Sequence, residues 1–163
     1  MRAAVVAAPG GEVAVVDDVE VDEPRAGEAL VAVDAAGVCG TDRSLQSGAM
    51  AYPMPLLLGH EATGRVVALG DGTDGADVAV GDRVVLWMRP PCRACRMCVR
   101  GQGELCERSG VMSARGTLLD GRTGLRRGGE PLYRALGIGA FAERVVMPVG
   151  GLVAVPDDVP PAV

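Results

Sequence analysis

Short apolar runs, separated by glycine, proline and acidic residues, recur along the whole chain. Each run is rich in valine or alanine and four to eight residues long, which is typical of β-strands. On this pattern we predict strands at residues 3–8, 13–16, 29–36, 64–70, 83–88, 141–147 and 152–155. The runs at 64–70 and 83–88 flank the segment DGTDGADVAVGD, so we expect them to pair across a glycine-rich turn.

Helical periodicity is scarce in this sequence. Residues 107–138 are polar and contain seven glycines, with a turn signal at Asp120-Gly121, so we expect an extended lobe of loops and short hairpins. Short strands with glycine-rich connections and few helices indicate a mainly β (α+β) fold, either a barrel or a sandwich.

Composition narrows the class of protein. The chain has 163 residues, 48% of them apolar, which suits one domain with a single buried core. A net charge of −5 gives no basic face for nucleic acid. No apolar run approaches the roughly 20 residues that span a bilayer, and the opening MRAAVVAAPGG is interrupted too soon to be a signal peptide. We therefore expect a cytoplasmic protein that binds neither nucleic acid nor membrane.

Four of the five cysteines lie in one segment, with the spacing Cys92-x2-Cys95-x2-Cys98-x7-Cys106. An odd number of cysteines in a chain without a secretory signal argues against a disulfide framework. Two-residue gaps let a tight loop aim neighbouring thiolates at one point, so the segment predicts a closed, structural zinc site. An iron–sulfur cluster and plain reduced thiols are the alternatives, although the long last gap does not match the ferredoxin pattern.

The fifth cysteine, Cys39, and the only histidine, His60, form a second candidate metal site. A lone histidine is often a core residue, but here Gly59 precedes it and Glu61 follows it directly. A catalytic zinc takes three protein ligands from cysteine, histidine and carboxylate and keeps one position open. Cys39 and His60 supply two ligands, and Glu61 is a candidate for the third. Asp42 is a candidate to accept the other ring N–H of His60 and fix its tautomer.

Three competing motifs fail on the residues present. HEATG is not the metalloprotease motif HExxH, because its fifth residue is glycine. A cysteine-protease dyad of Cys39 and His60 would leave Thr41 and Asp42 without a role. Residues 137–142 match G-x-G-x-x-A, but a dinucleotide fingerprint needs a strand before it and a helix after it, and neither is expected here.

Four motifs together resemble the zinc-dependent alcohol dehydrogenases of the medium-chain dehydrogenase/reductase family: VCGTD, GHEATGRVVALG, GDRVV and the four-cysteine loop. The resemblance covers nearly the whole chain. It implies the N-terminal GroES-like catalytic domain of these enzymes, a partly open β-barrel with a structural-zinc lobe. The long stretch from Gly116 to Glu143 is similar to that of the subgroup that includes thiol-dependent formaldehyde dehydrogenases.

The resemblance implies a role for each candidate residue. Cys39 and His60 match catalytic zinc ligands, and Glu61 matches the neighbouring carboxylate. Thr41 matches the hydroxyl that relays the substrate proton, and Asp42 matches the acid behind the histidine. Ser44 stands where many members carry a histidine at the outer end of the proton relay, so this sequence departs from the family pattern at that position. The structural zinc ligands are matched by Cys92, Cys95, Cys98 and Cys106.

Members of the family bind NAD or NADP on a Rossmann domain that follows the GroES-like domain and carries the last catalytic zinc ligand. We assign residues 1–155 to the GroES-like domain, with a zinc lobe at 89–138, and residues 156–163 to the start of a linker. The Rossmann domain is absent from this chain, so we expect little turnover from it alone.

The resemblance thus implies an NAD(P)-dependent oxidoreductase of small-molecule alcohols or aldehydes, with zinc as metal cofactor. At full length we expect a homodimer or homotetramer. The alternatives are a stand-alone zinc-binding protein and a GroES-like assembly module without redox activity.

Overall fold

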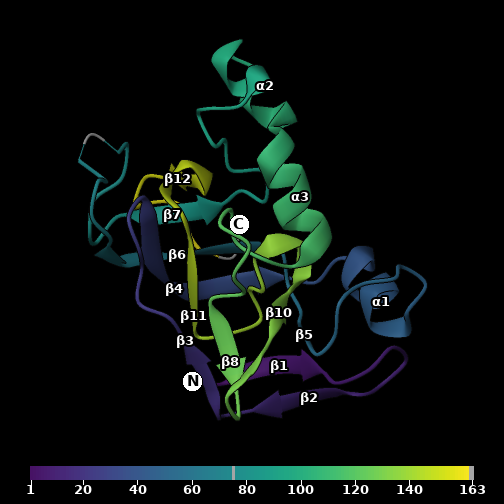
Figure 1. Ribbon diagram of the computed structural model, residues 1–163. Helices are drawn as coiled ribbons and strands as arrows, with labels where there is room; N and C mark the ends of the chain where they lie inside the picture. The colour runs from purple at the N-terminus through teal and green to yellow at the C-terminus, as the bar shows by residue number, and fades with distance from the viewer. Residues whose placement is uncertain (75, 162–163) are drawn as a thin grey trace.

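The structure, a computed structural model, describes residues 1–74 and 76–161 (Figure 1). Its strands are β1 (Ala3–Val6), β2 (Val13–Val16), β3 (Val19–Val21), β4 (Glu28–Gly37), β5 (Leu56–Leu57), β6 (Glu61–Leu69), β7 (Arg83–Leu86), β8 (Leu125–Arg127), β9 (Glu130–Pro131), β10 (Tyr133–Arg134), β11 (Arg144–Pro148) and β12 (Leu152–Ala154). The helices are α1 (Gly40–Ser47), α2 (Arg96–Val99) and α3 (Glu107–Arg115), with short 3₁₀ turns η1 (Gly103–Leu105), η2 (Ala135–Gly137) and η3 (Val149–Gly151).

A five-stranded antiparallel sheet in the order β11-β4-β6-β7-β12 is the centre of the fold. The remaining described strands form a four-stranded sheet, β10-β5-β1-β2, and a three-stranded sheet, β3-β8-β9. Among the described residues these sheets are not joined into one closed hydrogen-bonded ring, as expected for a partly open barrel. The mainly β fold predicted from the sequence is confirmed.

The predicted strands correspond to β1, β2, β4, β6, β7, β11 and β12, with ends displaced by at most three residues. The predicted pairing of β6 with β7 is confirmed, with Thr63 opposite Val85 and Arg65 opposite Arg83. Residue 75 of the connecting turn lies outside the described residues, as do residues 162–163 of the predicted linker.

The main core lies against the five-stranded sheet and contains valine, alanine, leucine, isoleucine and methionine. On β6 and β7, buried side chains such as Val66 and Val84 alternate with more exposed ones, because successive strand residues point to opposite faces. Gly64 allows β4 and β6 to approach closely: a Cβ there would lie 2.2 Å from the carbonyl oxygen of Ala32. This sheet provides the rigid floor of the site described below.

The prediction of loops and hairpins alone for residues 107–138 is wrong, because Glu107–Arg115 forms helix α3. This helix buries only Ser109 and Met112, so its sequence lacks the apolar stripe of a typical packed helix. Glu107 in its first turn, Arg115 in its last turn and the left-handed Gly116 that ends it all favour a helix locally. The lobe does contain a short hairpin, β8 and β9, but it turns at Gly128-Gly129 and not at Asp120-Gly121. None of the described helices is long and apolar enough to cross a bilayer.

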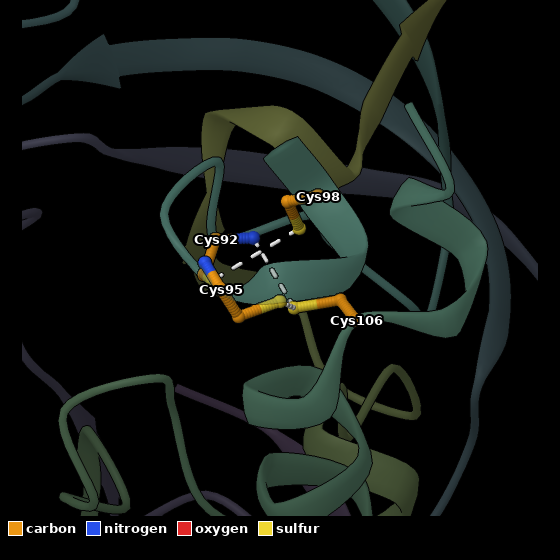
Figure 2. A group of neighbouring side chains, drawn as sticks. All are labelled: Cys92, Cys95, Cys98 and Cys106. Carbon is orange, nitrogen blue, oxygen red and sulfur yellow. Dashed lines mark hydrogen bonds between the residues drawn. The ribbon is translucent and has the colours of Figure 1, made fainter. Parts of the chain in front are cut away.

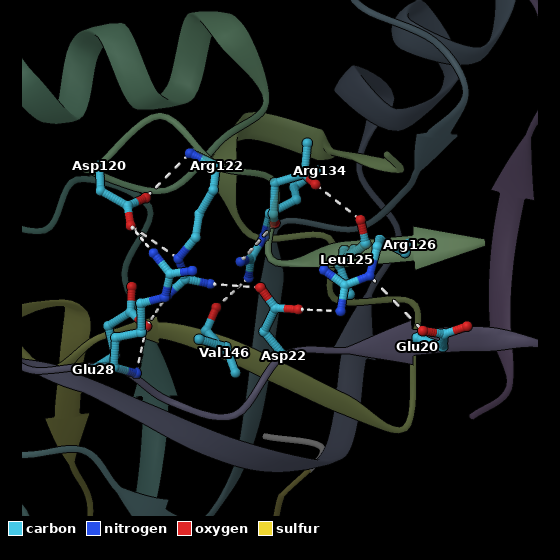
Figure 3. Close-up of polar contacts among 11 residues, drawn as sticks. Glu20, Asp22, Glu28, Asp120, Arg122, Leu125, Arg126, Arg134 and Val146 are labelled. Carbon is cyan, nitrogen blue, oxygen red and sulfur yellow. Dashed lines mark hydrogen bonds and ion pairs between the residues drawn. The ribbon is translucent and has the colours of Figure 1, made fainter. Parts of the chain in front are cut away.

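A buried arginine ties the lobe that follows α3 to the five-stranded sheet (Figure 3). The guanidinium of Arg134 donates hydrogen bonds to the carbonyl oxygens of Ile138 (3.0 Å), Thr123 (3.4 Å) and Val146. Burial lowers the pKa of Arg134 to about 9, and the negative charge of Glu28 opposes that fall. Arg134 therefore joins three backbone segments, none more than 12 residues away in sequence, through a side chain that water does not reach.

Candidate functional site

A cavity of about 770 Å³ opens at one end of the five-stranded sheet, where β4 and β7 end and β6 begins. Four residues singled out from the sequence line it: Cys39, Thr41, His60 and Glu61. They come from two segments, the start of α1 and the start of β6, which the fold brings together. The fold therefore brings these four side chains to one cavity. The sequence spacing alone only suggested that they are neighbours.

The carboxylate of Asp42 makes contacts with both of these segments. It occupies the first turn of α1, where its Oδ2 accepts a hydrogen bond from the backbone N–H of Cys39 (3.0 Å). Its Oδ1 accepts from the backbone N–H of Gly59 (3.0 Å) and lies 3.2 Å from Nδ1 of His60. A carboxylate at a helix N-terminus is favoured by the helix dipole, so local sequence and site geometry agree here.

The position of His60 depends on the glycine before it. Gly59 has a φ of +90°, and a Cβ there would lie 2.6 Å from the backbone nitrogen of Phe141, so no larger residue fits. The carboxylate of Asp42 requires a proton on Nδ1 of His60, which leaves the Nε2 lone pair free for a metal. The predicted contact between Asp42 and His60 is therefore present in the structure.

Cys39, His60 and Glu61 meet the geometric requirement for a shared ion. One ligand atom from each lies within 4.8 Å of the others, and Nε2 of His60 is 3.7 Å from Oε1 of Glu61. The three donors are a thiol, an imidazole and a carboxylate, the set that suits a catalytic zinc site with an open position. The hydroxyl of Thr41 lies 3.6 Å from Sγ of Cys39 at the same cavity wall.

The four remaining cysteines converge in the lobe that carries α2 and the start of α3 (Figure 2). Their sulfurs all lie within 4.8 Å of one another, with 4.0 Å between Cys92 and Cys98 and 3.9 Å between Cys95 and Cys106. A tetrahedral zinc ion with bonds of about 2.3 Å requires sulfurs about 3.8 Å apart. A multi-iron cluster needs more room between its thiolates, so the geometry fits a single ion better.

The electrostatics of this cluster also fit a cation. Burial opposes ionisation of Cys106, but the backbone N–H groups of Ser109 and Cys92 lower its pKa to about 6. Loss of solvation and the neighbouring thiol of Cys95 raise the pKa of Cys98 to about 12. Sulfurs this close do not all ionise unless a cation shares their charge, which is the role of a divalent metal.

Comparison with known proteins identifies the family. The profile described as the alcohol dehydrogenase GroES-like domain matches residues 25–157. The chain belongs to this family.

The relatives are zinc-binding alcohol dehydrogenases of the medium-chain class. The chain is 37% identical over 158 residues to an S-(hydroxymethyl)glutathione dehydrogenase of Komagataella pastoris, covering 96% of this chain and 41% of the relative. Its structure resembles an alcohol dehydrogenase zinc-binding domain protein from Burkholderia ambifaria, with a TM-score of 0.87 and 33% identity, covering 98% of this chain and 42% of that one. It also resembles benzyl alcohol dehydrogenase from Acinetobacter calcoaceticus, with a TM-score of 0.85 and 28% identity, covering 98% and 42%. The chain thus spans about two fifths of the length of these relatives.

Sequence reasoning missed part of the cavity wall of this alcohol dehydrogenase domain. Trp87 and Met88 follow β7 and line the cavity, as do Thr63 on β6 and Pro161 near the end of the described chain. Trp87 is the only tryptophan in the sequence, and its place at the end of a predicted strand is the one signal that pointed to it. The contribution of Pro161 depends on the tertiary fold and has no local signature.

Ser44 lies apart from the other candidates. It is half-buried on α1, does not line the cavity, and its hydroxyl donates to the carbonyl oxygen of Gly40 (3.2 Å). In this alcohol dehydrogenase domain the hydroxyl of Ser44 therefore bonds to the backbone of its own helix and not to a group in the cavity. Its predicted place in the proton route stays a prediction.

Proposed function

We propose that this chain is the catalytic-zinc domain of an NAD(P)-dependent oxidoreductase that interconverts small alcohols and aldehydes. One observation carries the proposal. Cys39, His60 and Glu61 converge on the wall of one cavity, with Thr41 beside them and Asp42 orienting both Cys39 and His60. This arrangement supplies metal ligands, a proton-carrying hydroxyl and space for a substrate at a single point.

Each residue has a defined task in this proposal. Cys39 and His60 would hold a catalytic zinc, with Glu61 as the third ligand from this chain. When bound, zinc supplies Lewis acidity, which makes an alcohol hydroxyl more acidic, and NAD(P) accepts the hydride. Thr41 lies on the cavity wall, where its hydroxyl can take the substrate proton. Because Ser44 is bonded to the Gly40 carbonyl, we propose that the proton leaves Thr41 through water in the open cavity.

The other assignments follow from the same proposal. Cys92, Cys95, Cys98 and Cys106 would hold a structural zinc that is independent of substrate. Residues 137–142 do not open a helix, since β11 follows them, so they offer no dinucleotide fingerprint. We therefore propose that NAD or NADP binds to another domain of a longer cytoplasmic protein, which forms homodimers or homotetramers. Residues 1–163 alone would then show little turnover.

The proposal is tested by replacing Cys39 in the full-length protein. Cys39→Ala should abolish alcohol-dependent reduction of NAD⁺ or NADP⁺ and lower the zinc content by about one ion per chain. Val38→Ala, at the neighbouring and highly exposed position, is the matched control and should leave both quantities unchanged. Normal turnover of the Cys39→Ala variant would rule the proposal out. Full zinc content without any turnover of the wild type would favour a zinc-binding protein without redox activity.

A further inference from the structure

A second concave surface lies between helix α3 and the turn that follows it (Figure 1). This groove has a volume of about 360 Å³, and the residues that line it all lie between positions 107 and 121. It shares no residue with the cavity of the candidate functional site. A molecule bound in the groove is therefore a partner of the protein and not its substrate.

The floor of the groove is apolar. Met112 and Leu118 line it, and each is only 1% exposed, so their side chains form a fixed surface. Val111 lines the groove as well but is 51% exposed, which leaves apolar area that a bound molecule can cover. An apolar floor with a few polar groups around it is typical of a binding site.

Two arginines flank Val111 on α3. Arg108, Val111 and Arg115 are spaced three and four residues apart, so their side chains form one stripe along the helix. Seven residues of α-helix place the Cα atoms of Arg108 and Arg115 about 10 Å apart. A molecule lying along the groove therefore meets a cation, an apolar side chain and a second cation, in that order.

Two acidic residues also line the groove, but each has an arginine partner outside it. The carboxylate of Glu107 lies 3.8 Å from the guanidinium of Arg96, and that of Asp120 lies 2.9 Å from the guanidinium of Arg122. The negative charge of the groove is therefore largely neutralised by neighbouring groups.

The two arginines of the groove have no such acidic partner. Arg108 donates one hydrogen bond to the carbonyl oxygen of Leu119 (3.3 Å), which leaves its other N–H donors open. Arg115 is exposed, and within residues 1–74 and 76–161 its guanidinium makes no ion pair. Both groups can therefore pair with carboxylates of a bound molecule.

The charge of the surrounding lobe also favours an acidic partner. Residues 89–115 contain six of the sixteen arginines of the chain and only two of its 21 acidic residues. A zinc ion with its four thiolates adds a formal charge of about −2, so the lobe remains positive when it is loaded. The whole chain has a net charge of −5, so the lobe attracts acidic groups whereas the rest of the chain repels them.

These features favour a short acidic peptide segment over nucleic acid. An extended peptide rises about 3.3 Å per residue, so acids roughly two to four residues apart can reach both Arg108 and Arg115. A nucleic acid would place phosphates along the whole groove, including beside Glu107 and Asp120. No aromatic side chain is among the described residues of the groove, so bases would have nothing to stack on.

We propose that the groove formed by α3 and residues 117–121 is a docking site for an acidic segment of another protein. The segment carries two carboxylate side chains, which pair with Arg108 and Arg115, and an apolar side chain between them, which covers Val111.

The experiment measures binding of a short acidic peptide to the zinc-loaded chain. The probe is fluorescein-labelled, end-blocked Glu-Leu-Glu-Leu-Glu, and its fluorescence anisotropy is followed as the chain is added. The peptide Gln-Leu-Gln-Leu-Gln lacks the charges, and Glu-Ser-Glu-Ser-Glu lacks the apolar side chains. We expect each of these to bind at least about fivefold more weakly than the probe, because each loses one of the two kinds of contact.

Two pairs of variants locate the binding. Arg115→Gln should weaken it about fivefold, whereas Arg100→Gln, which removes the same charge from an exposed position outside the groove, should weaken it less than about twofold. Val111→Asp should weaken binding about tenfold, whereas Val99→Asp, at an exposed position of α2, should leave it close to that of the wild type. Circular dichroism and zinc content verify that the variants fold.

Four results would overturn the inference. The first is no binding of the probe at concentrations up to about 1 mM. The second is an equal loss in Arg115→Gln and Arg100→Gln, which would show that only net charge matters. The third is equal or tighter binding of an oligothymidylate, which would make the groove a site for nucleic acid. The fourth is self-association of the chain that Arg115→Gln abolishes, which would make the partner a second copy.

Discussion

Asp42 shows how one buried side chain can define a site without lining it. Its two carboxylate oxygens hold the backbone of Cys39, the backbone of Gly59 and the ring of His60, so both candidate ligands depend on the same group. The side chain of Asp42 is only 4% exposed, and that of His60 only 5%. Buried hydrogen bonds to a charged acceptor are strong, so this contact fixes the ring as well as its tautomer.

Replacing Asp42 by asparagine should therefore weaken the metal site. We expect Asp42→Asn to lower the affinity of the Cys39–His60 site for Zn²⁺ by about 10–100-fold, because the amide oxygen is a weaker acceptor for the Nδ1–H of His60 than the carboxylate, and the amide NH2 faces a backbone N–H that the carboxylate accepts from. Competition with a chromogenic chelator measures this change. Asp34→Asn, at an exposed position of β4, is the control and should bind Zn²⁺ as the wild type does. Unchanged affinity in Asp42→Asn would show that Asp42 does not position His60.

At the scale of single residues, four of the candidates singled out from the sequence line the cavity, although the rest of its wall was missed. Cys39, His60 and Glu61 stand out because thiol, imidazole and carboxylate groups have few structural uses in that pattern. Arg134 did not stand out, because an arginine gives no local sign that it will be wholly buried. Its role depends on carbonyl groups of three separate segments, which only the tertiary structure brings together.

At the scale of elements, residues 156–161 follow β12 and cross the outer face of β6 and β7. We call this segment the strap. Arg83 donates to two of its carbonyl oxygens, Arg65 pairs with Asp157, and the hydroxyl of Thr63 donates to the carbonyl oxygen of Pro161 (2.9 Å). Because Pro161 lines the cavity, these contacts place one end of the strap at the site.

Loss of Arg83 should release the strap and open this side of the cavity. We expect Arg83→Gln to increase the quenching of Trp87 fluorescence by acrylamide about twofold or more, since the backbone contacts that hold the strap are lost and each is worth about 1 kcal/mol. Asp157→Asn removes only an exposed ion pair and should change quenching little. Circular dichroism verifies that both variants fold. Equal quenching in wild type and Arg83→Gln would show that the strap does not shield the cavity.

Strands were easier to predict than helices in this chain, for a physical reason. Strands such as β4 are long valine- and alanine-rich runs, so their pattern is visible in the sequence. Helix α1 has only one buried apolar residue, Leu45, and α3 only Met112, so neither carries a periodic apolar face. Both begin directly after a candidate metal ligand, Cys39 and Cys106, and their positions follow from the sites more than from their own hydrophobic pattern.

For the whole molecule, the two candidate metal sites are independent of each other. The four-cysteine site belongs to a lobe with α2 and α3, whereas the Cys39–His60 site is built on the five-stranded sheet. All four ligands of the first site come from this chain, which makes it a closed site. The second site exposes Glu61 to solvent and is open.

This independence predicts unequal metal retention. We expect the purified chain to keep about one zinc ion after dialysis, held by the four cysteines, because a closed site of four thiolates binds more tightly than an open one. Cys98→Ala should lose that ion and part of the helical circular dichroism of the lobe. Cys39→Ala should keep it. A dialysed wild type without zinc, or equal zinc retention by Cys98→Ala and wild type, would contradict the prediction.

The spacing of the ligands along the chain also has a consequence for how the protein is assembled. The four cysteines close a loop of only fifteen residues, from Cys92 to Cys106, and loops this short cost little entropy to form. Cys39 and His60 are brought together by the pairing of β4 with β6, which joins residues as distant in sequence as Ala29 and Leu69. Local contacts form faster than distant ones. We therefore expect folding of the lobe to depend on the ion, and formation of the open site to depend on the pairing of β4 with β6.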